Sequence, residues 1–278
     1  MIDLHSHTTA SDGTFSPQAL VDCAVSIGLE ALAITDHDTL DGYEEARPLA
    51  RAAGLRLICG IELSTKLDRR DRRTVHLLGY FLRGDPAPSF CKWLLDLQVS
   101  RRDRNRRLAE RLQSLGISIT LEEVEALGRN MAGRPHFARI LIEKGYVSNY
   151  REAFDRYLDE SAPGYVDREE PGFFEAIAQL HSAGGVGSLA HPIRLNLGVS
   201  EEEKVVARLA GGGLDAIEAW HSDHTPADTL RYQALAERFK LKVTGGSDFH
   251  GDNKPNVRLG YGPGALNVPV SVLDNLVA

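Results

Sequence analysis

The sequence predicts an α/β protein built as a distorted (β/α)7 barrel with a mainly helical insertion. Short apolar segments alternate with amphipathic helical segments along the first 80 residues and again after Pro171, which is typical of parallel βα units. About seven such units fit a barrel, with an open, doubly wound sheet as the alternative. Between the two stretches helical spacing dominates. We therefore expect a barrel from 1–82 and 165–278, and a helical insertion or cap from 83–164.

The first alternating stretch has clear boundary signals. Ser16 is placed to cap a helix, Pro17 suits its first position and Gly28 suits its end. The charged segment KLDRRDRR, 66–73, reads as an exposed turn before the fourth strand. We expect strands at 1–5, 29–35, 55–63 and 74–82, and helices at 16–28 and 41–54.

The middle stretch and the second alternating stretch are assigned in the same way. Thr120 and Glu123 form a capping box at the start of one insertion helix. We expect insertion helices at 90–98, 106–116, 120–128, 137–145 and 150–160. In the second alternating stretch we expect helices at 172–185, 200–213 and 226–239, and strands at 186–191, 215–221 and 242–250.

Composition narrows the class of protein. The 278 residues are 42% hydrophobic and 26% charged, which is ordinary for a globular protein. We see no apolar run of membrane-spanning length and no secretory signal, and the three cysteines lack CxxC spacing, so we expect a cytoplasmic protein with reduced thiols. The net charge of −7 argues against a dedicated duplex-DNA binder, and we expect no membrane partner.

Histidines and carboxylates gather where the expected strands end. HSH at positions 5–7 sends both imidazoles to one side of the chain, because residues i and i+2 of a strand share a face. A single HxH or TDHD motif is weak evidence, since either also suits a turn or a cap. In a parallel barrel, however, the carboxyl ends of all strands meet at one face. Their joint placement therefore predicts a site for two or three divalent metal ions, with Glu62 suited to bridging two of them.

The ordered motifs DLHSHTTASDG, ITDHDT, GIELS, VHLLGY, AHP and GGSDFH resemble the PHP (polymerase and histidinol phosphatase) family of metal-dependent barrels. The resemblance covers nearly the whole chain. It implies a distorted seven-stranded barrel with up to three divalent metals, which we expect to be Mn, with Zn or Fe as alternatives. It also implies three ligand groups: His5, His7, Glu62 and Asp248; Glu62, His76 and His191; and Asp12, His37 and His250.

Within that family, AGRPHFAR and HSDHTP make the chain similar to nucleoside 3′,5′-bisphosphate phosphatases. The expected reaction is hydrolysis of the 3′-phosphate by metal-bound water. A 5′-to-3′ exoribonuclease acting on short 5′-phosphorylated RNA is the first alternative. A histidinol-phosphate phosphatase is the second, and a non-catalytic metal-binding module is a third.

Further polar residues are candidates for substrate contact. Arg134 is the first choice for a phosphate ligand, because a guanidinium matches phosphate oxygens in a planar fork. The segment RRDRNRR, 101–107, reads either as a solvated helix face or as a basic strip that steers an anionic substrate. The other candidates are His136, Arg194, His221 and His224 for phosphate, and Asp36 and Asp38 for orienting His37 from behind.

Overall fold

The computed structural model describes residues 1–67, 74–128, 131–261 and 266–277. Within these residues, seven strands form one sheet in chain order. The ends of the first and last strands also meet, because Leu4 N donates to Gly245 O at 3.1 Å. The sheet is therefore a nearly closed barrel, as predicted, and not an open sheet. Its strands are β1 (Ile2–Asp3), β2 (Ala31–Ile34), β3 (Arg56–Lys66), β4 (Thr74–Phe81), β5 (Val186–Leu189), β6 (Ala216–His221) and β7 (Lys242–Gly246).

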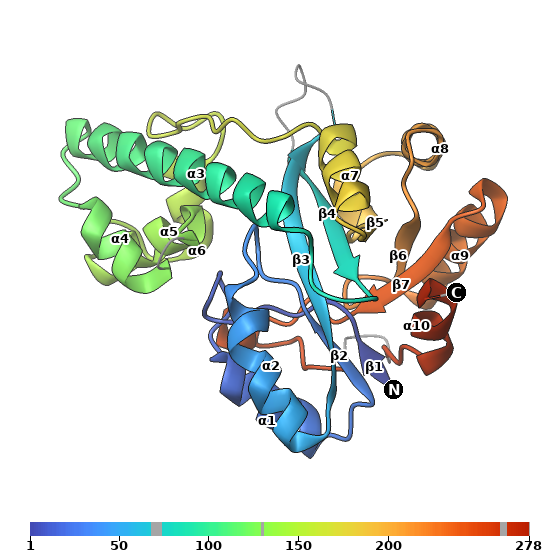
Figure 1. The fold of residues 1–278 in the computed structure, drawn as a ribbon. Helices are drawn as coiled ribbons and strands as arrows, with labels where there is room; N and C mark the ends of the chain where they lie inside the picture. Colours follow the sequence, from blue (N-terminus) through green and yellow to red (C-terminus); the bar gives the residue numbers. More distant parts are fainter. Residues whose placement is uncertain (68–73, 129–130, 262–265, 278) are drawn as a thin grey trace.

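Helices surround the barrel and build the insertion (Figure 1). Two predicted caps are confirmed: Ser16 Oγ accepts from Ala19 N at 3.2 Å, and Thr120 and Glu123 exchange side-chain to backbone bonds. The helices are α1 (Pro17–Ser26), α2 (Asp41–Ala53), α3 (Pro88–Ser114), α4 (Leu121–Gly128), α5 (Arg134–Glu143), α6 (Tyr150–Ala153), α7 (Phe173–Ser182), α8 (Val199–Gly211), α9 (Pro226–Phe239) and α10 (Val270–Val277).

One strand departs from the predicted parallel sheet. β4 is antiparallel to both β3 and β5, with Ser64 opposite His76. The reason lies in the short link from Lys66 to Thr74, since a parallel return needs a crossover of a dozen or more residues. The start of β4, not its end, therefore lies beside the carboxyl end of β3. The charged turn expected over 66–73 falls mostly outside the described residues.

The insertion has its own apolar core. α3 is a single helix through RRDRNRR, where the sequence suggested two helical segments, and it carries the chain from the barrel to α4, α5 and α6 (Figure 1). Leu112, Phe137 and Leu141 are fully buried together there, apart from the barrel clusters. A separate core is what an independent structural unit requires, so it supports our proposal that the insertion is a unit of its own, while Phe90 and Leu94 at the start of α3 belong to the barrel core.

Apolar residues close one end of the barrel. Leu273 and Leu276 of α10 pack against Ile2 and Leu4 at the floor of the sheet. Each such buried side chain contributes about 1.5–3 kcal/mol. None of the described helices combines the length and the hydropathy that a membrane crossing would need.

Candidate metal centre

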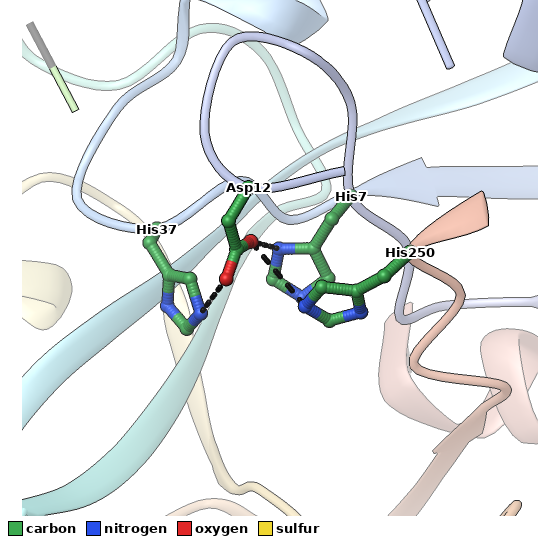
Figure 2. A group of neighbouring side chains, drawn as sticks. All are labelled: His7, Asp12, His37 and His250. Carbon is green, nitrogen blue, oxygen red and sulfur yellow. Dashed lines mark ion pairs between the residues drawn. The ribbon is translucent and has the colours of Figure 1, made fainter. Parts of the chain in front are cut away.

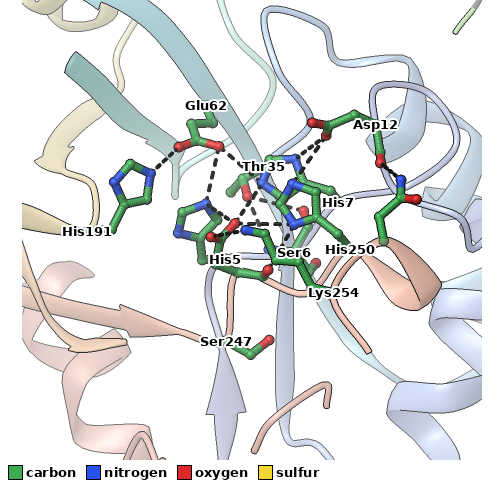
Figure 3. A network of polar contacts seen from close by, with 12 residues as sticks. His5, Ser6, His7, Asp12, Thr35, Glu62, His191, Ser247, His250 and Lys254 are labelled. Carbon is green, nitrogen blue, oxygen red and sulfur yellow. Dashed lines mark hydrogen bonds and ion pairs between the residues drawn. The ribbon is translucent and has the colours of Figure 1, made fainter. Parts of the chain in front are cut away.

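The barrel brings all nine predicted ligands to one face, and Figure 3 shows His5, His7, Asp12, Glu62, His191 and His250 gathered there. His76 joins them only because β4 runs backwards, which places its third residue at this face. His5, His7 and Asp12 follow β1, His37 follows β2, Glu62 lies in β3, His76 lies in β4, His191 follows β5, and Asp248 and His250 follow β7.

The first group is fully buried and comprises His5, His7, Glu62 and Asp248. His7 Nε2 lies 3.1 Å from Glu62 Oε2 and 3.4 Å from Asp248 Oδ1. His5 Nε2 lies 3.3 Å and 3.4 Å from the same two oxygens. Both Nε2 atoms lack a hydrogen-bond partner among the described residues. Two orphaned nitrogens facing two carboxylate oxygens are what a divalent cation would satisfy.

The second group uses the other oxygen of Glu62. Oε1 lies 2.8 Å from His76 Nδ1 and 2.9 Å from His191 Nε2. These two nitrogens are 3.3 Å apart. The two oxygens of Glu62 thus face different imidazoles, and this arrangement fits a carboxylate that bridges two cations.

The third group is arranged around Asp12 (Figure 2). Its carboxylate lies 3.3 Å from His250 Nε2, 3.6 Å from His7 Nδ1 and 3.7 Å from His37 Nε2. His37 also turns its Nδ1 toward Glu62, at 3.4 Å. His37 can therefore serve either the third group or the one around Glu62 and His76, a choice that the sequence pattern did not suggest.

Electrostatics in this cluster are strongly coupled. Burial opposes ionisation of Glu62, but the imidazoles of His76, His37 and His5 hold its pKa well below the usual range. Burial also disfavours charge on His7, yet Asp248 and Glu62 outweigh it and raise the pKa of His7 to about 9. For His37 the effect of burial is larger than that of Glu62 and Asp12, and it lowers the pKa to about 3. Without cations, the cluster balances its carboxylates with protons held on some of the imidazoles.

Glu218 in β6 holds two of these ligands and was missed in the sequence. Its Oε1 accepts from His5 Nδ1 at 2.9 Å, and its Oε2 accepts from His191 N at 2.6 Å. The first bond holds a proton on Nδ1, so Nε2 is the nitrogen of His5 that is available to a cation, as metal-binding histidines require. A signal was present, because a glutamate inside the apolar segment AIEAWH is rarely buried without a partner.

Asp3 stabilises the backbone next to the metal centre. Its buried carboxylate accepts from His5 N at 3.1 Å, Ser247 N at 3.0 Å and Gly260 N at 2.8 Å. These bonds tie the end of β1 to the end of β7. Asp3 was also missed, although it is the one charged residue in MIDLH besides the histidine.

Asp36 and Asp38 are buried behind His37, but neither hydrogen-bonds to it within the described residues. Asp36 accepts from Thr8 N at 2.8 Å and Ser11 Oγ at 2.6 Å, so it holds the loop that carries His7 and Asp12. Asp38 accepts from Ser64 N at 2.8 Å. The expected role in orienting His37 is therefore replaced by one in fixing the loops around the centre.

Backbone strain is concentrated at the same loops. Asp38, His191 and Asp248 have φ values of 50°, 26° and 56°, in the left-handed region that non-glycine residues rarely adopt. Such conformations persist only where surrounding contacts hold them. The backbone of His191 is held by Glu218, and that of Asp248 by His5 O, which accepts from Asp248 N at 2.8 Å.

Arg134 and His136 lie at the start of α5, over the centre. Arg134 lines a cavity of about 190 Å³ together with Asp12, His37 and His76. Its guanidinium lies over the rings of Phe154 and Tyr165, at 5.9 Å and 5.8 Å. His136 lines this cavity too, but its Nδ1 accepts from Gly133 N at 3.1 Å and caps the helix.

The other predicted phosphate ligands have different surroundings. Arg194 reaches the centre, with Nη1 2.8 Å from Asp248 Oδ2. His221 Nε2 lies 3.4 Å from the same oxygen, and its Nδ1 accepts from Asp223 N. His224 donates from Nδ1 to Ala219 O at 2.9 Å and lies behind His221, a position that favours a structural role over substrate contact.

A comparison with known proteins agrees with this geometry. The family model described as PHP domain matches residues 3–166. The 5′-3′ exoribonuclease Rnm of Escherichia coli (strain K12) is 38% identical over 89% of this chain and 84% of its own length. The 3′,5′-nucleoside bisphosphate phosphatase of Chromobacterium violaceum is 32% identical over 94% of this chain and 90% of its own.

A solved structure shows the same fold. The structure of an amidohydrolase from Chromobacterium violaceum, with bound sulfate and no metal, has a TM-score of 0.85 and 30% identity over 99% of this chain and 95% of its own. Together with the matched family model and the histidine and carboxylate cluster, this establishes the class of the protein. The chain belongs to the PHP domain family and is a metal-dependent hydrolase that acts on phosphoric ester bonds.

Proposed function

We propose that the protein removes the 3′-phosphate from nucleoside 3′,5′-bisphosphates, giving the nucleoside 5′-monophosphate and inorganic phosphate. One observation carries this proposal: the ligand cluster lines a cavity of about 300 Å³ with both cationic and aromatic walls. Arg194 and Lys254 contribute the positive charge, and Phe154 and Tyr150 contribute the rings. A bisphosphate phosphatase among the relatives supports the same substrate class.

We propose that the three ligand groups hold two or three divalent cations, with Mn first and Zn or Fe as alternatives. Mixed imidazole and carboxylate ligation suits all three metals. When bound, such cations lower the pKa of water and neutralise phosphoryl oxygens.

The side chains around Asp248 prepare the site for a phosphate. Arg194 and Lys254 both contact Asp248 Oδ2, so Oδ1 is left facing His5 and His7. His221 accepts a backbone N–H at Nδ1. Nε2, which lies 3.4 Å from Asp248 Oδ2, is therefore the ring nitrogen that can donate to this carboxylate. Together these groups fix Asp248, and Arg194 and Lys254 add positive charge beside the incoming phosphate.

The proposed reaction consumes one water. Its oxygen forms a bond to the 3′-phosphorus, the bond from phosphorus to the 3′-oxygen breaks, and that oxygen leaves with a proton as the 3′-hydroxyl. The aromatic wall formed by Phe154 and Tyr150 suits a stacked base, since bases stack on such rings without regard to sequence.

A 5′-to-3′ exoribonuclease is the second candidate, favoured by the 38% identity to an exoribonuclease across most of both chains. The same centre would then cleave a phosphodiester bond. Water would attack the phosphorus between the first two nucleotides, the 3′-oxygen of the first would leave as its 3′-hydroxyl, and the phosphate would stay on the 5′-oxygen of the next.

A substrate screen of the Mn-loaded protein tests both candidates. It compares adenosine 3′,5′-bisphosphate, a 5′-phosphorylated trinucleotide RNA and histidinol phosphate, with released phosphate and nucleotides quantified. We expect the highest kcat/KM for the bisphosphate, with 5′-AMP as the product. A higher kcat/KM for the trinucleotide would make the exoribonuclease the main activity, and activity confined to histidinol phosphate would contradict both.

A further inference from the structure

The arginines of the segment 101–107 divide into two sets. Arg101 and Arg104 are buried, whereas Arg102 and Arg106 are exposed and pair with Glu125 and Asp103 on the surface. Positions i and i+3 share a helix face, so α3 turns the first two toward the barrel. The segment is therefore not simply a solvated face.

The buried arginines line the cavity of about 190 Å³ described above. We call it the arginine pocket and define it by Arg101, Arg104, Arg134 and Arg168. It also includes His37 and His76, which line the cavity over the ligand cluster as well. One small molecule could thus contact the arginine pocket and the metal centre together.

Positive charge in the arginine pocket exceeds the negative charge available. Arg101 and Arg168 both contact Asp38, at 3.1 Å for Arg168, and Glu170 lies 3.8 Å from Arg168 Nε. Arg104 is only 6% exposed, yet it has no hydrogen bond or ion pair within the described residues. The Nε atoms of Arg101 and Arg168 are likewise buried, and neither has a hydrogen-bond partner among the described residues.

Such an arrangement is costly unless a ligand completes it. A buried ionic group without a partner is strongly unfavourable, and arginine does not escape by losing its proton. Burial, together with the guanidinium groups of Arg101, Arg168 and Arg134, holds the pKa of Arg104 well below its usual value. An anion in the cavity would offset the excess positive charge and accept hydrogen bonds from Arg104.

We propose that the arginine pocket binds the phosphate that is not hydrolysed, with Arg104 as its principal ligand. This inference rests on the proposed function, in which a substrate carries two phosphates. The metal centre then receives the 3′-phosphate and the arginine pocket receives the 5′-phosphate of the same nucleotide. Guanidinium groups bind phosphate oxygens through paired, charge-assisted hydrogen bonds.

The insertion therefore selects the substrate. Arg101 and Arg104 come from α3 and Arg134 from α5, whereas the metal ligands come from the barrel. A nucleotide with a 3′-phosphate alone fills the metal centre and leaves the arginine pocket empty. Loss of the charge-assisted bonds to Arg104 corresponds to about a 10- to 100-fold loss of kcat/KM.

Phosphate binding tests the proposal without catalysis. Inorganic phosphate is titrated calorimetrically into chelator-treated protein, as wild type and as the Arg104→Lys, Arg104→Met and Arg106→Gln variants. We expect affinity to fall from wild type to Arg104→Lys and at least tenfold to Arg104→Met. Arg106→Gln, an exposed arginine two residues along the same helix, should bind as the wild type does. Equal affinity in Arg104→Met and wild type would overturn the proposal.

Thermal unfolding in phosphate-free buffer separates binding from structure. Because Arg104 lacks a partner, Arg104→Met should melt at the same temperature as wild type or higher. A lower melting temperature would give Arg104 a structural role and refute the proposal.

Kinetics link the pocket to the reaction. Wild type should prefer adenosine 3′,5′-bisphosphate to 3′-AMP, and Arg104→Met should lose at least tenfold of that preference; an unchanged ratio would overturn the proposal. If wild type hydrolyses neither nucleotide, the proposed function fails, while the phosphate titration still decides whether the pocket binds the anion.

Discussion

Glu218→Gln is the sharpest test of how the metal centre is held. The side chain is fully buried and accepts two hydrogen bonds, from the His5 ring and the His191 backbone. The substitution preserves shape but leaves one acceptor oxygen and adds an NH2 donor. Either the His5 ring N–H or the His191 backbone N–H must then face the new NH2 group, which is itself a donor. If the oxygen stays with His191, the His5 ring must accept at Nδ1 and carry its proton on Nε2, where it points at the cation.

The expected magnitude follows from those two bonds. Loss of a carboxylate behind a metal-binding histidine lowers metal affinity about 10- to 100-fold, which is about 1.4–2.7 kcal/mol. A buried N–H left without an acceptor costs about 1–3 kcal/mol, in the same range. The effect should therefore appear as weaker Mn binding, with activity restored at high Mn concentration.

Competition with a fluorescent chelator measures that affinity, and activity is measured as a function of Mn concentration. Glu237→Gln, an exposed glutamate on α9, is the matched control and should behave as wild type. The reasoning fails if Glu218→Gln binds Mn within twofold of the wild-type affinity and reaches full activity at the same Mn concentration.

Three other perturbations probe the site. Asp248→Ala or Glu62→Ala should remove bound metal, measured by atomic absorption, and activity together, and full activity in either variant would place the centre elsewhere. Arg134→Ala should raise KM for the bisphosphate about tenfold or more through a lost phosphate contact, whereas unchanged kinetics would move phosphate recognition to other residues. Because Asp248 and Glu62 raise the pKa of His7 to about 9 in the metal-free protein, Mn must displace a proton below that pH. Its affinity should rise with pH between 7 and 9, by about tenfold per pH unit for each proton displaced, as calorimetry in two buffers would show; a flat profile would exclude His7 as a titrating ligand.

The barrel and its ligand cluster were predictable because both rest on local patterns. Apolar segments alternated with capped helices, and the histidine motifs other than that of His76 stood at or just after the end of a segment. The direction of β4 was harder to predict, since periodicity identifies a strand without giving its direction. The brevity of the link from Lys66 to Thr74 was the missing signal.

Residues that act through distant partners could not be inferred in the same way. Glu218 belongs to the centre only because β6 is two strands from β1 around the closing barrel. The split between Arg101 and Arg102 depends on which face of α3 meets the barrel, and sequence spacing alone does not select that face. His224 looked like a site residue by its position after a strand, but its ring turns behind His221.

Because α3 is one unbroken helix, its rotation about its own axis decides which side chains point into the arginine pocket. Phe90, near the start of the helix, packs against Phe81 at the end of β4, with ring centroids 5.2 Å apart. Arg101 meets Asp38 at the other face of the barrel, about three turns later. Deleting one residue between them would rotate everything downstream by about 100° and swing the inward arginines out of the pocket. A change of about 7 or 11 residues would restore the facing of the arginines but would still move them along the helix axis by about 1.5 Å per residue, so the pocket depends on the length of this part of α3 as well as on its phase.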